Sequence, residues 1–241
     1  MKVIKVKNYE ELSRTAATII AGVILSKPDC ILGLATGSSP VGTYDQLAAM
    51  YEEGILDFSH VKSVNLDEYE GLARDHDQSF GYFMDQLFFS KVNLKEENIF
   101  LVDGAADAAK QEKRFNDFLK DNKIDIQILG IGNNGHIGFN EPDSYFTASA
   151  HKVELAEETI KANARFFEKE SDVPRSAITM GMYGIATAAK VILVATGAAK
   201  APAIKKLLES DHVDPQLPCS ILHICEDATV IVDKDLYELT K

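Results

Sequence analysis

The stretch of sequence best able to do chemistry is a glycine-rich segment in the middle of the chain. Residues 130–142 read GIGNNGHIGFNEP and hold one histidine, His136, among four glycines. Glycines let the backbone approach a small ligand closely, and loops positioned by a rigid scaffold often carry function. Because histidine exchanges protons near neutral pH, His136 is a candidate general base, with Asn134 or Glu141 fixing its tautomer. The alternative is a structural histidine.

The same segment matches the GxGxxG pattern of dinucleotide sites at Gly130, Gly132 and Gly135. That fingerprint opens a helix and normally follows the first strand of its unit, whereas Gly138 and Pro142 break a helix here. We therefore expect no dinucleotide site.

A second candidate site is the turn LATGSSP at residues 34–40. Backbone N–H groups at a helix start favour an anion, and Gly37 allows a close approach. The hydroxyl groups of Thr36, Ser38 and Ser39 can add hydrogen bonds to a phosphate. The lysine and the spacing of a nucleotide P-loop are missing. The pattern therefore leaves two readings open, a phosphate site or an ordinary turn in which Ser39 caps the helix.

Two adjacent carboxylates, Asp67 and Glu68, follow the strand predicted at residues 61–66. If the strand continues through them, their side chains point to opposite faces, so they cannot act as a pair on one substrate. One of them is then a candidate catalytic carboxylate. The other reading is that both are solvated acids that open a loop.

Other catalytic patterns are missing from the sequence. The three cysteines, Cys30, Cys219 and Cys225, lack the spacing of a zinc site and indicate no disulfide framework, which fits a reducing compartment. The GxSxG elbow of α/β-hydrolases is not present. We expect no bound metal.

Strand and helix patterns alternate along most of the chain, which is typical of a Rossmann-like three-layer α/β sandwich: a mostly parallel sheet with helices on both faces. Because such sheets bind ligands at the carboxyl ends of their strands, the three loops above are expected to meet. We find no linker and expect a single domain over residues 1–241. Strands are predicted at residues 3–6, 30–35, 61–66, 98–102, 124–131, 190–195, 220–224 and 229–232. Helices are predicted at residues 9–25, 40–54, 79–90, 105–121, 183–189 and 199–209.

The charge balance limits the partners. Lys and Arg total 25 against 37 for Asp and Glu, a net charge of −12, which disfavours nucleic acid and anionic membranes. An anionic substrate must therefore be held by a local pocket. No secretory signal or membrane-spanning run is visible, so we expect a cytoplasmic protein.

Taken together, LGLATGSSPVGTY, NLDEY and GIGNNGHIGFNEP resemble the glucosamine-6-phosphate deaminase family over nearly the whole chain. Arg165 in NARFF and Lys200 in GAAK also match positions of that family. The related 6-phosphogluconolactonases share the phosphate loop and a Gly-His pair. They differ after the histidine, where the residues NEP agree with the deaminases.

The resemblance implies an isomerising deamination, in which glucosamine 6-phosphate and water give fructose 6-phosphate and ammonium without a metal or organic cofactor. It implies that His136, assisted by Asn134 and Glu141, opens the sugar ring, and that Asp67 moves a proton from C2 towards C1. The phosphate-binding residues that it implies are Thr36, Gly37, Ser38, Ser39, Arg165 and Lys200.

The sequence departs from the family in two places. Many members carry aspartate where this chain has Asn134. Longer members that respond to N-acetylglucosamine 6-phosphate have basic residues after the position of Pro142 and a longer C-terminal tail. We therefore expect a monomer or small homo-oligomer without that allosteric site. Residues 144–172 are a candidate lid over the sugar.

Three other functions compete with the deaminase. A lactonase of the same superfamily would hydrolyse 6-phosphogluconolactone and release no ammonia. A sugar-phosphate-sensing module would bind without turnover, but such modules are usually joined to a DNA-binding domain, and no basic helix-turn-helix segment is visible. A glycosidase would need two suitably separated carboxylates and gives no reason for a phosphate loop.

Overall fold

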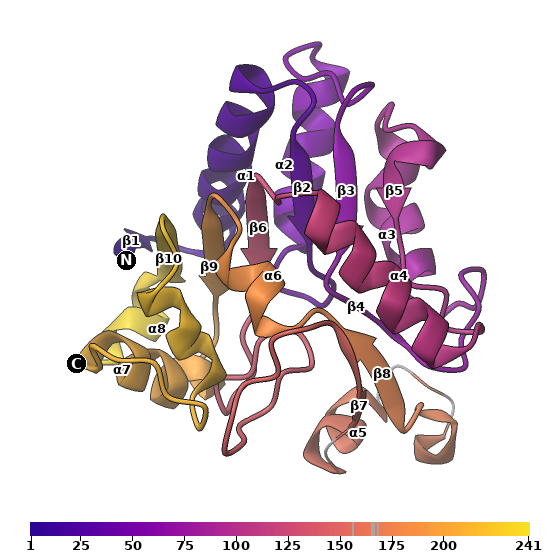
Figure 1. Cartoon of the computed structure of the whole chain (residues 1–241). Helices are drawn as coiled ribbons and strands as arrows, with labels where there is room; N and C mark the ends of the chain where they lie inside the picture. Colours follow the sequence, from indigo (N-terminus) through magenta and orange to yellow (C-terminus); the bar gives the residue numbers. More distant parts are fainter. Residues whose placement is uncertain (156, 165–166, 168) are drawn as a thin grey trace.

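The chain is described by a computed structural model, which covers residues 1–155, 157–164, 167 and 169–241 (Figure 1). Within these residues, a seven-stranded sheet forms the centre, and its neighbouring strands pair in parallel. The strand order is β1-β10-β9-β6-β2-β3-β5. The strands are Lys2–Val6 (β1), Ile31–Leu34 (β2), Lys62–Asn65 (β3), Ile99–Phe100 (β5), Ile126–Leu129 (β6), Val191–Ala195 (β9) and Ala228–Asp233 (β10).

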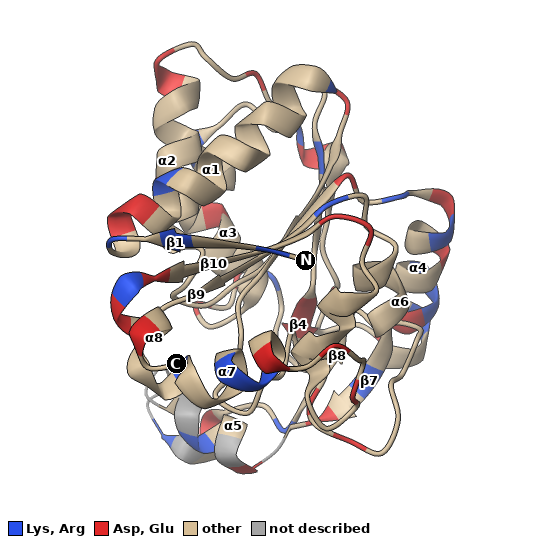
Figure 2. Cartoon of the chain, turned by 90° about the vertical axis from the view of Figure 1, so that its left-hand side faces the viewer, with Lys and Arg blue, Asp and Glu red and all other residues tan. Residues whose placement is uncertain are grey.

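Helices cover both faces of this sheet, so the predicted α/β sandwich is confirmed. Figure 2 shows α1 and α2 on one side and α4 and α6 on the other. The helices are Tyr9–Ser26 (α1), Val41–Glu52 (α2), Phe80–Leu87 (α3), Ala108–Asp121 (α4), Glu157–Asn163 (α5), Met182–Ala186 (α6), Ala201–Glu209 (α7) and Lys234–Glu238 (α8). The short 3-10 helices are Phe89–Lys91 (η1), Glu96–Asn98 (η2), Glu170–Asp172 (η4), Ala198–Lys200 (η5) and Pro218–His223 (η6). In the described part of the chain, no helix has both the length and the apolar composition to cross a membrane.

The starts of the first two helices follow the sequence only in part. Asn8 caps α1 directly before the helix predicted at residues 9–25, because its side chain accepts the N–H of Glu11 at 3.0 Å. The prediction that Ser39 caps α2 is wrong. The helix begins at Val41 after Pro40, and no side chain caps it. The hydroxyl group of Ser39 is therefore not used to cap the helix.

Residues 220–224 form no strand, contrary to the prediction. Residues 220–223 lie in η6, and Ile224 follows it as the C-cap residue. The Ser220 hydroxyl donates to the carbonyl oxygen of Asp214 and accepts the N–H of the same residue, at 3.0 and 2.7 Å. These bonds favour a turn over an extended backbone. Ile221 and Leu222 are buried in this helix as they would be in a strand, so the apolar run does not distinguish the two.

A second sheet lies near the carboxyl ends of the central strands, in the lower part of Figure 1, and the sequence analysis did not predict it. It is antiparallel, and the order of its strands is β4-β8-β7. Each strand has only three or four residues, too few to show a clear alternation of apolar and polar positions. The strands are Asp67–Tyr69 (β4), His151–Glu154 (β7) and Ser176–Thr179 (β8).

The order of the central strands reverses beside β2. The chain runs outward from β2 to β3 and β5 and then returns to place β6 on the other side of β2. The loops that follow β2 and β6 therefore leave the sheet in different directions, and a crevice forms between them at the carboxyl ends of the strands. These are two of the loops that the sequence analysis singled out.

Candidate active site

One cavity of about 680 Å³ lies at this crevice and is lined by all three of the predicted loops. Ten site residues are predicted from the sequence and its family resemblance, and eight of them line the cavity. Glu141 does not line the cavity but contacts the imidazole of His136. Arg165 lies outside the described residues. The eight lining residues are Thr36, Gly37, Ser38, Ser39, Asp67, Asn134, His136 and Lys200.

His136 faces a carboxylate that is held by several hydrogen bonds. Its Nδ1 lies 3.2 Å from Oε2 of Glu141, and the same oxygen accepts a hydrogen bond of 2.7 Å from Nδ2 of Asn134. Burial alone would raise the pKa of Glu141, but the hydrogen bonds and the charge of His136 lower it to about 2. Because an ionised carboxylate can only accept, Nδ1 carries the shared proton. The lone pair of the neutral ring is then on Nε2, the nitrogen suited to act as a base.

Asn134 therefore acts on the ring through Glu141 and through the backbone. Besides its bond to Glu141, it accepts the backbone N–H of His136 with its side-chain oxygen, at 3.1 Å. The sequence analysis left open whether Asn134 or Glu141 fixes the tautomer. In the structure, Glu141 contacts the imidazole, and Asn134 orients Glu141.

The imidazole ring packs directly on the backbone of Gly132. A Cβ atom at this position would lie 2.3 Å from Nδ1 of His136, far inside van der Waals contact. The loop is closed at the same place by a hydrogen bond of 2.8 Å from the Gly132 N–H to the carbonyl oxygen of His136. Glycine is needed here because of the close approach, which a GxGxxG match alone does not reveal.

We expect Gly132→Ala to lower turnover by about 100-fold, because the added methyl group displaces the ring by an ångström or more from its place beside Glu141. Steady-state turnover measured with the folded variant tests this. The matched control is Gly22→Ala in α1, where a Cβ meets no atom within 4 Å, so turnover should not change. Equal turnover in the two variants would contradict the assigned ring position.

Asp67 and Glu68 both belong to β4, and their side chains point to opposite faces, as the sequence analysis expected of a continuing strand. Asp67 lines the cavity and is 7% exposed. Glu68 points away from it, because its carboxylate accepts the backbone N–H groups of Phe80 and Gly81 at the start of α3, both at 2.9 Å. Glu68 therefore stabilises a helix terminus, and Asp67 is the carboxylate that faces the cavity.

The environment of Asp67 favours its protonated form. Burial, with a smaller contribution from the charge of Glu68, raises the pKa of Asp67 to about 8. Burial also raises the pKa of Glu68 to about 7, although backbone N–H groups oppose the shift. A carboxyl group that titrates near neutral pH can both take and return a proton, which is the property required of an acid–base catalyst.

The second sheet fixes Asp67 relative to the glycine-rich loop. Asp67 pairs with Thr179 of β8, whose hydroxyl accepts the backbone N–H of Phe139 at 3.1 Å. The amide of Asn140 donates to the carbonyl oxygen of Met180 at 2.9 Å, just after the same strand. The short strand β8 therefore holds Asp67 and the loop of His136 together.

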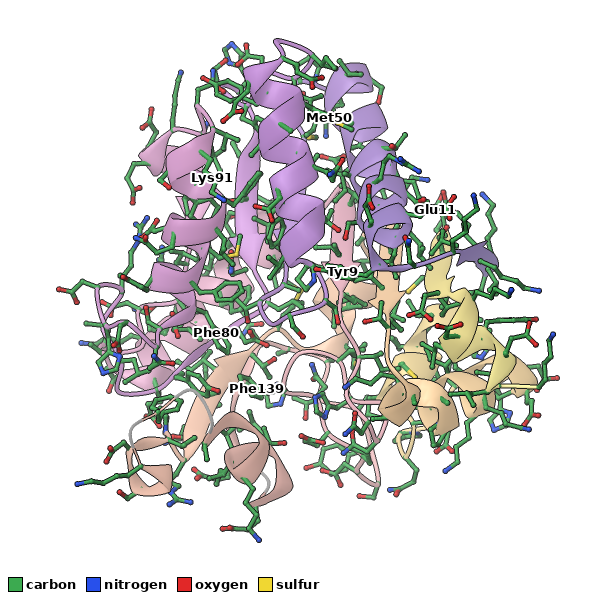
Figure 3. All side chains as sticks on the ribbon, turned by 180° about the vertical axis from the view of Figure 1, so that it is seen from behind. Tyr9, Glu11, Met50, Phe80, Lys91 and Phe139 are labelled. Atoms are coloured by element: carbon green, nitrogen blue, oxygen red, sulfur yellow. The ribbon has the colours of Figure 1, made fainter. Side chains whose placement is uncertain are left out.

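The turn at residues 36–39 presents hydrogen-bond donors to the cavity. Within the described residues, the backbone N–H groups of this turn have no acceptor. Gly37 has φ +91°, a conformation that favours glycine. Tyr9 of α1 supports the turn from outside, since its hydroxyl donates to the carbonyl oxygen of Ser38 and accepts the N–H of Gly42 (Figure 3). Together with Lys200 of η5, the turn provides a site for an anion.

An aromatic wall on one side of the cavity was missed by the sequence analysis. It consists of Tyr69, Phe80, Phe139 and Phe167, and the rings of Phe80 and Phe139 stack at a centroid distance of 5.9 Å. Phe80 and Phe139 are labelled in Figure 3. Tyr69, Phe139 and Phe167 belong to the segments NLDEY, GIGNNGHIGFNEP and NARFF, but nothing in these segments shows that their rings meet. Phe80 of α3 belongs to no such segment. The wall makes one side of the cavity apolar. In the described part of the chain, no group of three acidic, histidine or cysteine side chains could hold a metal ion.

A parallel α/β sheet with anion donors, a buried carboxylate and a carboxylate-bound histidine around one cavity is typical of enzymes that act on phosphorylated small molecules. Comparison with known families defines the class more closely. Residues 6–231 match the family model described as glucosamine-6-phosphate isomerases/6-phosphogluconolactonase, and the chain belongs to this family.

Individual relatives span the whole chain. The glucosamine-6-phosphate deaminase of Clostridium perfringens (strain 13 / Type A) is 46% identical over 243 residues, which cover 100% of both chains. That of Lachnoclostridium phytofermentans is 50% identical, covering 96% of this chain and 98% of its own. The solved structure of a monomeric glucosamine-6-phosphate deaminase superposes with a TM-score of 0.95 at 42% identity, covering 99% of this chain and 100% of its own.

Proposed function

We propose that this protein catalyses the isomerising deamination of glucosamine 6-phosphate in amino-sugar catabolism, giving fructose 6-phosphate and ammonium. The observation that carries the proposal is that Asp67, His136 and the turn at residues 36–39 line the same cavity. An anion site, an imidazole that can accept a proton and a carboxyl group that can take and return one are the three elements that this reaction uses. The deaminases that are 46% and 50% identical over nearly their full length support the same function.

Binding begins at the phosphate. The N–H groups of residues 36–39 and the hydroxyl groups of Thr36, Ser38 and Ser39 donate to its oxygens, and Lys200 adds a charged donor. Arg165 is proposed as a second cation from the family motif alone. These local donors act within a short distance, so they hold an anion in a protein whose net charge is −12.

Ring opening is assigned to His136. The imidazole takes the proton of the anomeric hydroxyl group and returns a proton to the ring oxygen, so the C1–O5 bond breaks and C1 becomes an aldehyde. The imidazole of His136 is positively charged between these two proton transfers. The ionised Glu141, whose Oε2 lies 3.2 Å from Nδ1, stabilises that charge.

Isomerisation and deamination are assigned to Asp67. The open-chain amino group on C2 carries a positive charge and acidifies the C2 proton, so a positioned carboxylate suffices as the base. Asp67 takes this proton while the ammonium group gives one proton to O1, so that a C1–C2 double bond forms and an enolamine results. Asp67 then delivers the proton to C1, which leaves an iminium ion at C2. Water then adds to C2, and ammonia leaves.

The test is to incubate the purified protein with glucosamine 6-phosphate and to follow ammonium and fructose 6-phosphate together, with and without a chelator. Equal amounts of the two products, with no effect of the chelator, are expected. A parallel incubation with 6-phosphogluconolactone tests the lactonase alternative. Rapid hydrolysis of the lactone without ammonia from the amino sugar would overturn the proposal.

We further propose a single domain over residues 1–241 that acts as a monomer without an N-acetylglucosamine 6-phosphate site, in the cytoplasm. The monomeric deaminase that is 42% identical and the buried free thiols of Cys30, Cys219 and Cys225 support this. Within the proposed lid at residues 144–172, Thr159 and Phe167 line the cavity.

We expect N-acetylglucosamine 6-phosphate to leave the initial rate unchanged at every substrate concentration, because residues 143–150 contain no lysine or arginine and Lys152 is paired with Glu70 at 2.7 Å. Initial rates with and without the effector test this, together with the mass in solution by light scattering. A rate increase, or a hexamer, would contradict the expectation.

A further inference from the structure

Thr159, on α5, contacts the catalytic group from the side opposite His136. Its hydroxyl donates a hydrogen bond of 2.8 Å to Oε1 of Glu141. The other oxygen of the same carboxylate, Oε2, contacts Asn134 and His136. The two oxygens of Glu141 therefore have different partners, and Thr159 also lines the cavity.

A carboxylate with one oxygen unbound can rotate about its terminal torsion, because that torsion is broad and nearly two-fold. Glu141 can therefore turn away from Nδ1 of His136 unless its other oxygen is held. The hydroxyl of Thr159 holds it. The same bond contributes to the low pKa of Glu141 and so keeps the carboxylate ionised beside the imidazole.

We propose that Thr159 is a positioning residue for ring opening, which acts through Glu141 to keep the proton of His136 on Nδ1 and the lone pair on Nε2. The inference deepens the proposed function and rests on it. Thr159 comes from α5, within the proposed lid, whereas His136 and Glu141 belong to the glycine-rich loop. One hydroxyl group thus connects that segment to the histidine that transfers the first proton.

Two substitutions separate this role from simple packing. Thr159→Val keeps the shape of the side chain and removes the hydroxyl, whereas Thr159→Ser keeps the hydroxyl and removes a methyl group. We expect Thr159→Val to lower kcat by about 10- to 100-fold with little change in KM, because a bond to a charged group is lost. Thr159→Ser should stay within about threefold of the original chain.

The control is Thr18→Val in α1. It removes a helical threonine hydroxyl that bonds to the carbonyl oxygen of Arg14 at 2.7 Å and does not line the cavity. Its kcat and KM should not change. A rise in KM without a fall in kcat for Thr159→Val would mean that Thr159 contacts the substrate instead, and would overturn the proposal.

A spectroscopic measurement on the free protein tests the same idea without turnover. With ¹⁵N-labelled histidine, the signals of His136 are identified by their loss in His136→Asn, and long-range ¹H–¹⁵N correlation reports the tautomer. The Nδ1–H form is expected in the original chain and in Thr159→Ser, and a mixture of tautomers in Thr159→Val. An unchanged tautomer in Thr159→Val would overturn the proposal even if ammonia is produced. If the original chain makes no ammonia, the proposed function fails while the tautomer result stands.

Discussion

The substitution Asp67→Asn is expected to lower the turnover of glucosamine 6-phosphate by about 10³-fold, within the range found for a lost general base. Asparagine keeps the size of the side chain but cannot take the C2 proton. Substrate binding should change little, since the phosphate contacts at residues 36–39 are intact. The measurement is the release of ammonium and fructose 6-phosphate. Turnover above a tenth of the original would remove Asp67 from its assigned role.

The same variant should be more stable than the original chain at pH 7. The pKa of Asp67 is about 8 in the folded protein and near 4 in the unfolded chain. Between these values the unfolded chain is ionised at this position and the folded protein is protonated, so the free energy of unfolding falls as the pH rises. Removing the group should raise that free energy by about 1–4 kcal/mol at pH 7 and by little at pH 4. Urea unfolding at the two pH values measures the difference.

Glu68→Gln is the matched control for Asp67→Asn, because it removes the neighbouring carboxylate from the opposite face of β4. Glu68 accepts the N–H groups of Phe80 and Gly81, and an amide cannot satisfy both with its single oxygen. We expect lower stability, with turnover of the folded fraction within about threefold of the original, since only positioning is affected. A loss of turnover as large as that of Asp67→Asn would contradict the division of roles.

The sequence could predict the location of the site because parallel strands impose it. The turn at residues 34–40, the acids after residue 66 and the segment at residues 130–142 each follow a strand, and the carboxyl ends of parallel strands meet at one edge. The alternation of side chains along a strand also predicts that Asp67 and Glu68 point to opposite faces. These arguments need only the period of a strand and the direction of the sheet.

The parts that the sequence could not predict depend on contacts between distant segments. Strand β8 holds both Asp67 and Phe139, yet its four residues are too few to show a clear alternation of apolar and polar positions. The aromatic wall combines four segments, which are β4, α3, the glycine-rich loop and the segment after α5, and only the fold brings their rings together. The sequence around Thr159 does not distinguish it from any other helical threonine, and only the structure shows that its hydroxyl donates to Glu141 at 2.8 Å. Local patterns carry no information on such pairs.

The substitution His136→Asn is expected to lower turnover by about 10²- to 10⁴-fold, because the amide cannot accept the anomeric proton and ring opening is left to the solvent. Glu141→Gln should cost less, about 10- to 100-fold, since it keeps a hydrogen-bond partner for Nδ1 and loses only the charge that stabilises the imidazolium.

The double variant decides whether Glu141 acts through His136. If the carboxylate serves only to orient and charge-stabilise the imidazole, it has nothing left to assist once the ring is gone, so His136→Asn with Glu141→Gln should turn over as slowly as His136→Asn alone. The rates of ammonium release by the original chain, the two single variants and the double variant give the coupling free energy between Glu141 and His136. If the two losses of turnover multiply in the double variant, Glu141 has a separate contact with the substrate. The structure argues against such a contact, because Asn134 donates to the Glu141 carboxylate at 2.7 Å and Glu141 does not line the cavity.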